Sequence, residues 1–128
     1  MELLMTIQVG IKKTEELIGH TKNICMLEFD GTARGIYFNG EVIGTGVDTQ
    51  KIEKDGSMFL SARYMLEGLD MQQNPCRVFI ENNGGSLDDC TPVIYTDSPL
   101  LADWEGAKLK AKVTPCEGGV TVKIFKIQ

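Results

Sequence analysis

Arg63 and Glu81 are the first residues in this chain whose types suggest chemistry. A guanidinium held by a carboxylate inside a protein can orient a carbonyl, an enolate or a carboxylate of a ligand. The simpler alternative is an ion pair on the outer face that joins two strands and contributes less than about 1 kcal/mol. The direction in which the Arg63 side chain points decides between these interpretations.

Asp48 is the second candidate, because it follows Gly44 and Gly46 in a segment where the backbone can approach a neighbour closely. As a general acid or base, Asp48 needs a raised pKa in a partly dry pocket. The alternative, which the sequence favours, is an aspartate that closes its own turn by accepting hydrogen bonds from nearby amides. In a catalytic site, Arg63 would stabilise developing negative charge while Asp48 or Glu81 moves a proton.

Five further residues are candidates for ligand contact. They are Tyr64, Tyr95, Phe38, Asn82 and Trp104. The aromatic ones would line a cavity for a flat apolar ligand. The aromatic content of 7% is ordinary, so packing in the core is the default for these rings, and Asn82 most simply ends a strand.

No motif indicates a metal or a cofactor, and we expect neither. His20 is the lone histidine and has no partner at the spacing that zinc ligands show. The Gly-x-Gly segment precedes no helix and lacks a P-loop lysine, so it is not a nucleotide signal. The four cysteines (Cys25, Cys76, Cys90, Cys116) form no Cys-x-x-Cys pair and are expected to be thiols that pack in the core.

The elements that position these residues begin with a β-hairpin over residues 57–83. Every even position from 58 to 66 is apolar, as are positions 78 and 80, and side chains alternate faces along a strand. The two apolar faces coincide only when paired residue numbers have an even sum, and we predict the register in which this sum is 144. The predicted pairs are Tyr64 with Ile80, Leu66 with Val78, Arg63 with Glu81 and Glu67 with Arg77. Two of these pairs join opposite charges, which favours this register.

The rest of the chain shows the same kind of pattern. Short strands are predicted over residues 3–9, 24–29, 36–43, 92–95, 108–113 and 120–127, with single helical turns at 14–17 and 100–104. Leu3, Met5, Ile7 and Val9 are expected on one face of the first strand. Many short strands without a βαβ spacing predict an all-β fold, a single antiparallel β-barrel of about eight to ten strands formed by one domain over residues 1–128.

Charge and hydropathy limit the partners. The net charge of −5 repels phosphate backbones and anionic membrane surfaces, so we expect neither nucleic acid nor a membrane as a partner. No run approaches the roughly 20 apolar residues that a membrane-spanning helix needs. The first five residues lack the features of a signal peptide, and a cytoplasmic location is therefore expected.

Three segments carry a resemblance to a known family. They are Gly44-Thr45-Gly46-Val47-Asp48-Thr49-Gln50, Ala62-Arg63-Tyr64 and Glu81-Asn82-Asn83-Gly84-Gly85. In these motifs the chain resembles the domain of unknown function 3237 family, from about Thr6 to Phe125. One departure is Asp70-Met71, where the family often has Asp-Gly. The resemblance implies a compact antiparallel barrel similar to allene oxide cyclase-like proteins, with a cavity in or near its mouth. Fungal relatives linked to ring-closing steps on polyketides make a small-molecule cyclase or isomerase one of the implied activities.

Three functional hypotheses follow. The first is a barrel that binds an apolar or weakly acidic small molecule, with cofactor-free isomerisation or cyclisation as its reaction. The second is a non-catalytic ligand carrier that uses the same cavity. The third is a homo-oligomer with a structural role, whose interior is filled by its own side chains, since an eight-stranded barrel is just wide enough to be filled or to hold one small ligand.

Overall fold

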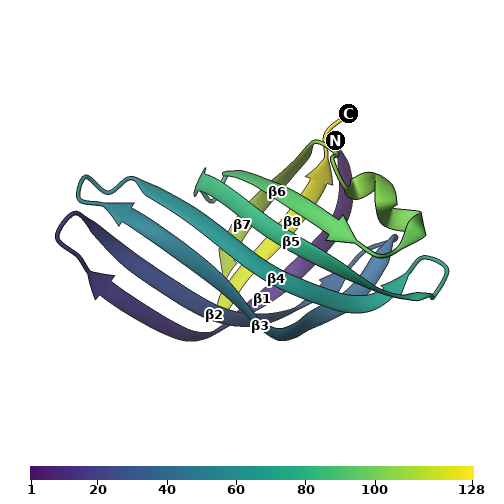
Figure 1. The fold of residues 1–128 in the computed structure, drawn as a ribbon, viewed down its shortest axis with the longest axis horizontal. Coiled ribbons are helices and arrows are strands. Elements are labelled where there is room, and N and C mark those ends of the chain that lie inside the picture. The colour runs from purple at the N-terminus through teal and green to yellow at the C-terminus, as the bar shows by residue number, and fades with distance from the viewer.

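The computed structural model describes residues 1–128 and shows a closed barrel of eight antiparallel strands, each paired with its neighbours in the chain (Figure 1). The strands are β1 (Glu2–Ile18), β2 (Lys22–Arg34), β3 (Phe38–Glu53), β4 (Met58–Asp70), β5 (Pro75–Ser86), β6 (Asp89–Thr96), β7 (Leu109–Cys116) and β8 (Gly119–Lys126). A 3₁₀ helix, η1 (Pro99–Trp104), joins β6 to β7. The predicted all-β antiparallel barrel is confirmed. The chain contains no helix of the length and apolarity needed to cross a bilayer.

The hairpin of β4 and β5 has the register predicted from the alternation. Tyr64 lies opposite Ile80, and Leu66, Arg63 and Glu67 face the expected partners. The side chains of Tyr64, Leu66, Val78 and Ile80 are all buried. Nε of Arg77 lies 2.9 Å from Oε2 of Glu67, so the outer face of this hairpin carries the expected ion pair. Period-two alternation together with the opposite-charge pairs on the outer face therefore places these two strands.

Strands β1 and β3 are much longer than predicted. The helical turn expected at residues 14–17 is wrong, because Thr14 to Leu17 continue β1 and pair with Leu27 to Ile24 of β2. β3 likewise continues through the glycine-rich segment at residues 44–46 and ends at Glu53. In Figure 1 the β1–β2 and β3–β4 hairpins extend beyond the other strands at the left. Hydrogen bonds to a partner strand, which are tertiary interactions, override the weak local preference in both places.

Bulges interrupt the regular pairing at defined positions. A register shift between Leu3 and Met5 buries Leu4 and leaves Leu3 42% exposed, so the prediction that Leu3 shares a face with Met5, Ile7 and Val9 is wrong. Further shifts lie between Ile11 and Lys13 in β1 and between Ile43 and Val47 in β3. Both of these irregularities flank Phe29 of β2, which pairs with Ile11 on one side and Gly46 on the other. A bulge adds a residue to one strand and increases the local twist.

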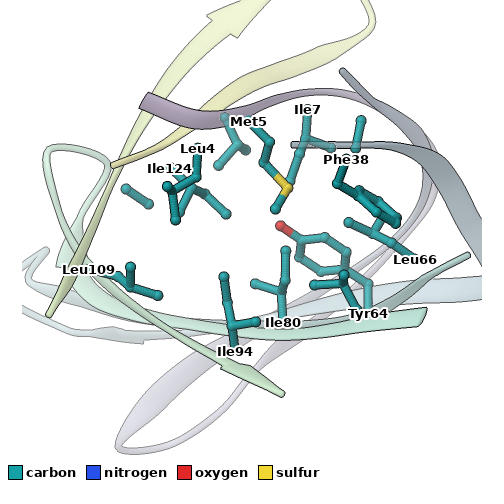
Figure 2. Packing of buried hydrophobic residues seen from close by; sticks show 14 of the residues in the cluster. Leu4, Met5, Ile7, Phe38, Tyr64, Leu66, Ile80, Ile94, Leu109 and Ile124 are labelled. Carbon is teal, nitrogen blue, oxygen red and sulfur yellow. The ribbon is translucent and has the colours of Figure 1, made fainter. Parts of the chain in front are cut away.

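One half of the barrel interior is densely filled. Its buried side chains include Leu4, Met5, Ile7, Phe38, Leu66, Ile80, Ile94, Leu109 and Ile124 (Figure 2). The alternation predicted for the last hairpin is confirmed, because Leu109, Ala111 and Val113 of β7 are buried while the lysines between them are exposed. Cys76 and Cys90 are buried thiols, as expected, but Cys116 is exposed at the end of β7. This half supplies the packed core that holds the rest of the barrel in position.

Candidate functional site

The other half of the interior contains a cavity of about 160 Å³. Eleven of its fourteen lining residues are hydrophobic. The lining is Val9, Ile11, Leu27, Phe29, Asp48, Gln50, Leu60, Ala62, Tyr64, Asn82, Leu87, Val113, Val120 and Val122. An engineered apolar cavity of about 150 Å³ is large enough to bind benzene. The cavity therefore has room for a molecule about the size of a single ring.

Three polar side chains face this apolar space. Nε2 of Gln50 donates a hydrogen bond of 3.0 Å to Oδ2 of Asp48. The other carboxylate oxygen of Asp48 is buried and has no hydrogen-bond partner. The same is true of Oδ1 of Asn82, a residue that is only 4% exposed. Two residues that line the cavity thus each carry a buried acceptor oxygen with no donor from the protein, and such groups are uncommon in folded proteins.

Neighbouring strands bring these polar groups to the same level of the barrel. Asp48 of β3 pairs with Ala62 of β4, and Ala62 pairs with Asn82 of β5. Paired residues on adjacent strands point to the same face of the sheet. Asp48 and Asn82 therefore flank Ala62, whose methyl group leaves space between them. The prediction that Asp48 closes its own turn is wrong, because the glycines before it form a bulge within a continuous strand.

Burial controls the electrostatics of the site. Desolvation raises the pKa of Asp48 above its usual value, although the Gln50 side chain and the nearby Ser61 backbone oppose this effect. Burial also raises the pKa of the Tyr64 phenol, which stays neutral throughout the physiological range. Desolvation disfavours the charged form of each acid. Asp48 is consequently the cavity group that is best suited to exchange a proton.

Aromatic packing shapes one wall of the cavity. The rings of Phe29 and Tyr64 meet edge to face, with centroids 5.3 Å apart and an interplanar angle of 74°. Figure 2 shows the Tyr64 hydroxyl pointing into the interior of the barrel. A Cβ atom at Gly46 would lie 2.4 Å from the Phe29 ring, so this position must be glycine for the ring to keep its place.

Arg63 and Glu81 lie on the outer face of the barrel. Nε of Arg63 is 3.4 Å from Oε1 of Glu81, and the Arg63 side chain is 65% exposed. Nδ2 of Asn83 donates a hydrogen bond to the other oxygen of Glu81. Odd-numbered residues of β4 point away from the cavity, which is lined by Leu60, Ala62 and Tyr64 of the same strand. The Arg63 guanidinium therefore cannot reach a ligand in the cavity.

Of the five predicted ligand contacts, two line the cavity and three lie elsewhere. Tyr64 and Asn82 line the cavity. Tyr95 is 56% exposed and stacks on Phe79 outside the barrel. Phe38 is fully buried in the filled half, and Trp104 of η1 packs edge to face against Tyr37.

Gln50 and Phe29 are cavity residues that the sequence analysis missed. Gln50 shares the parity of Asp48, so it follows Asp48 to the interior once that residue is placed. Phe29 ends a predicted strand but carries no local sign that it borders a void. The register between β3 and β4 is the information that would have found Gln50.

A closed eight-stranded antiparallel barrel with an apolar interior cavity is the class of protein that the fold and the site define. The profile of the family described as "Protein of unknown function (DUF3237)" matches residues 1–87. The chain belongs to this family. It is also 36% identical over 70 residues to a UPF0311 protein of Clostridium acetobutylicum. That alignment covers 55% of this chain and 40% of the length of the relative.

Solved structures with the same fold come from bacteria and a fungus. A protein of unknown function from Clostridium acetobutylicum superposes with a TM-score of 0.85 and 22% identity, covering 99% of this chain and 98% of the other. An enzyme from Penicillium herquei superposes with a TM-score of 0.82 and 13% identity, covering 99% of this chain and 92% of the other. A β-barrel-like protein from Acinetobacter baumannii superposes with a TM-score of 0.83 and 16% identity, covering 99% of this chain and 94% of the other. At these identities the likeness concerns the fold alone.

Proposed function

We propose that this protein binds a small, largely apolar molecule in the barrel cavity, and that the molecule carries at least one hydrogen-bond donor. The observation that supports this proposal is that Asp48 and Asn82, which line the apolar cavity, each carry a buried acceptor oxygen without a partner. A buried acceptor without a donor costs about 1–3 kcal/mol, which a ligand hydroxyl would recover. The volume of about 160 Å³ limits the ligand to roughly one ring.

The chemistry of the acceptors narrows the ligand class. An ionised carboxylate and an amide carbonyl both accept hydrogen bonds, so the ligand must donate to them. A phenol, an enol or an alcohol meets this requirement and is at most a weak acid. A ligand carboxylate is disfavoured, because it would place a second negative charge beside Asp48 in a poorly solvated space. The favoured ligand is therefore a hydroxylated ring.

A cofactor-free proton transfer is a second candidate function, favoured by the desolvated carboxyl of Asp48. In such a reaction Asp48 takes the proton of a ligand hydroxyl or enol and returns it to another ligand atom, so that the product is an isomer. Arg63 and Glu81 have no part in this scheme, because they lie on the outer face. Binding without catalysis is the better supported of the two, since the cavity holds a single carboxyl group among mostly apolar residues.

Two matched probes, p-cresol and toluene, test the proposal by calorimetric titration or ligand-observed NMR. They have nearly the same shape, but only p-cresol carries a donor. We expect p-cresol to bind about tenfold or more tightly than toluene, because a hydrogen bond to a charged group contributes about 1.5–3 kcal/mol. Ala62→Leu, which fills the space between Asp48 and Asn82, should abolish binding of both probes.

Arg63→Ala is the matched control, because it changes the next residue of the same strand on the opposite face. It should leave both affinities unchanged. Equal affinity for the two probes would refute the donor requirement. Binding that survives Ala62→Leu would show that the ligand sits elsewhere.

A further inference from the structure

The second half of β1 has an unpaired edge. β8 pairs with β1 only as far as Gly10, and the N–H of Ile11 donates to the carbonyl of Gly118. From Lys12 to Ile18, β1 has β2 on one side and no strand on the other. We call residues 12–18 the free edge. It is about 23 Å long at roughly 3.3 Å per residue, and its outward N–H and C=O groups can pair with another strand.

We propose that two copies of the chain associate by antiparallel pairing of their free edges, with Thr14 opposite Thr14 of the second copy. Antiparallel edges related by a two-fold axis perpendicular to the sheet form an isologous contact, in which each interaction occurs twice. The axis at Thr14 places Lys13 opposite Glu15 of the second copy, and Glu15 opposite Lys13. Opposite charges and paired threonines are both favourable across neighbouring strands.

The side chains of Lys13 and Glu15 occupy one face of the sheet, as this pairing requires. Nζ of Lys13 lies 3.2 Å from Oε1 of Glu15 in the same chain, and both side chains are more than 60% exposed. A two-fold axis perpendicular to the sheet keeps each face on its own side. Each Lys13 ammonium can therefore reach Glu15 of its own chain and Glu15 of the second copy without turning to the other face.

Alternative registers are less favourable, because they place identical charges on the axis. An axis at Lys12 or Lys13 opposes two lysines, and an axis at Glu15 or Glu16 opposes two glutamates. Like charges directly opposite each other on neighbouring strands are destabilising. Within the charged stretch 12–16, the register centred on Thr14 is thus the one that the charges select.

Charge reversal tests the proposal by measuring mass in sedimentation equilibrium up to about 0.5 mM protein, since an interface this small belongs to the weak class. The wild-type chain should approach twice the 14.1 kDa of one chain as its concentration rises. Lys13→Glu and Glu15→Lys should each remain monomeric, because they oppose like charges. The double variant Lys13→Glu/Glu15→Lys should dimerise again, since it restores both pairs.

Lys112→Glu is the matched control, because it makes the same change of charge at an exposed position of β7 that is far from the free edge. It should dimerise like the wild type. Thermal unfolding of each variant checks that the chain is folded. If Lys13→Glu does not fold, the test rests on Glu15→Lys alone. A wild-type chain that stays monomeric at every concentration overturns the proposal. So does a dimer that both single reversals leave intact.

Discussion

The two halves of the barrel interior are built by the same strands and yet differ in content. β4 passes through both, with Leu66 fully buried in the filled half and Ala62 beside the cavity. In the filled half, large apolar side chains meet across the barrel. Around Ala62, the residues of the neighbouring strands are Asp48 and Asn82, which are short and polar. The cavity thus depends on the size and polarity of a few inward residues, because β4 and β5 pair without a register shift through both halves.

The largest contrast should appear when a leucine of each half is truncated. Leu66→Ala should lower the free energy of unfolding by about 2–5 kcal/mol, because it opens a void in a close-packed region. Leu60→Ala, at a residue that already borders the cavity, should cost clearly less, since part of its surface has no packing partner to lose. Chemical denaturation of both variants measures the difference. Equal losses would mean that the two halves are packed alike.

Asp48→Asn should stabilise the protein at neutral pH. The pKa of Asp48 in the folded protein is raised above the unfolded value of 3.8. The stabilisation of the folded state by the protonated carboxyl is therefore fully present below pH 3.8. This stabilisation is lost as the pH rises through the pKa of Asp48 in the folded protein, whereas the asparagine side chain of the variant carries no charge at any pH. The melting temperature of the variant should exceed that of the wild type at pH 7 by a few degrees, about 4 °C for each kcal/mol, and the difference should shrink towards pH 4.

Calorimetric melting curves between pH 4 and pH 8 test this prediction for Asp48. Asp88→Asn, at an exposed position, is the control and should show no comparable trend. A melting temperature that falls at pH 7 in Asp48→Asn would contradict the view that desolvation dominates at this carboxyl.

The smallest effect is expected on the outer face. Arg63→Ala should change the free energy of unfolding by less than about 1 kcal/mol, because its ion pair with Glu81 is largely exposed. Denaturation in low and high salt measures both the change and its electrostatic part. A loss as large as that of Leu66→Ala would place Arg63 among the residues that hold the barrel together, and the comparison of inner and outer faces would fail.

Alternation predicted the strands whose inner faces are uniformly apolar. In the β4–β5 hairpin the inward residues near the filled half are hydrophobic or tyrosine, so parity showed which faces meet, and the opposite charges on the outer face selected the register. Around Asp48 and Gln50 the inward residues are polar, and the same signal is absent. The glycines before Asp48 were interpreted locally as a turn, although the pairing of β3 with β4 carries the strand through them.

Strand ends and bulges were the other features that the sequence did not reveal. Thr14 to Leu17 contain no strand signal of their own and are extended because β2 pairs with them. Leu3 and Leu4 are identical in type, and the bulge between Leu3 and Met5 decides which one is buried. Both outcomes depend on a partner strand that is distant in sequence. The candidate site was therefore found in part, through Tyr64, Asn82 and Asp48, and the apolar even face of β4 already favoured the outward direction of Arg63 that the structure shows.

The irregularities on either side of Phe29 have a consequence for the shape of the molecule. Extra residues at Lys12 in β1 and at Gly44 to Gly46 in β3 lie beside Phe29 of β2, at one level of the sheet. The twist that each adds therefore falls at the same level of β1, β2 and β3. These few inserted residues thus influence the direction in which the long hairpins leave the barrel. Deletion of Lys12 alone would keep every inward side chain of β1 facing inward. It would straighten β1, while β3 would keep the bend at its own bulge.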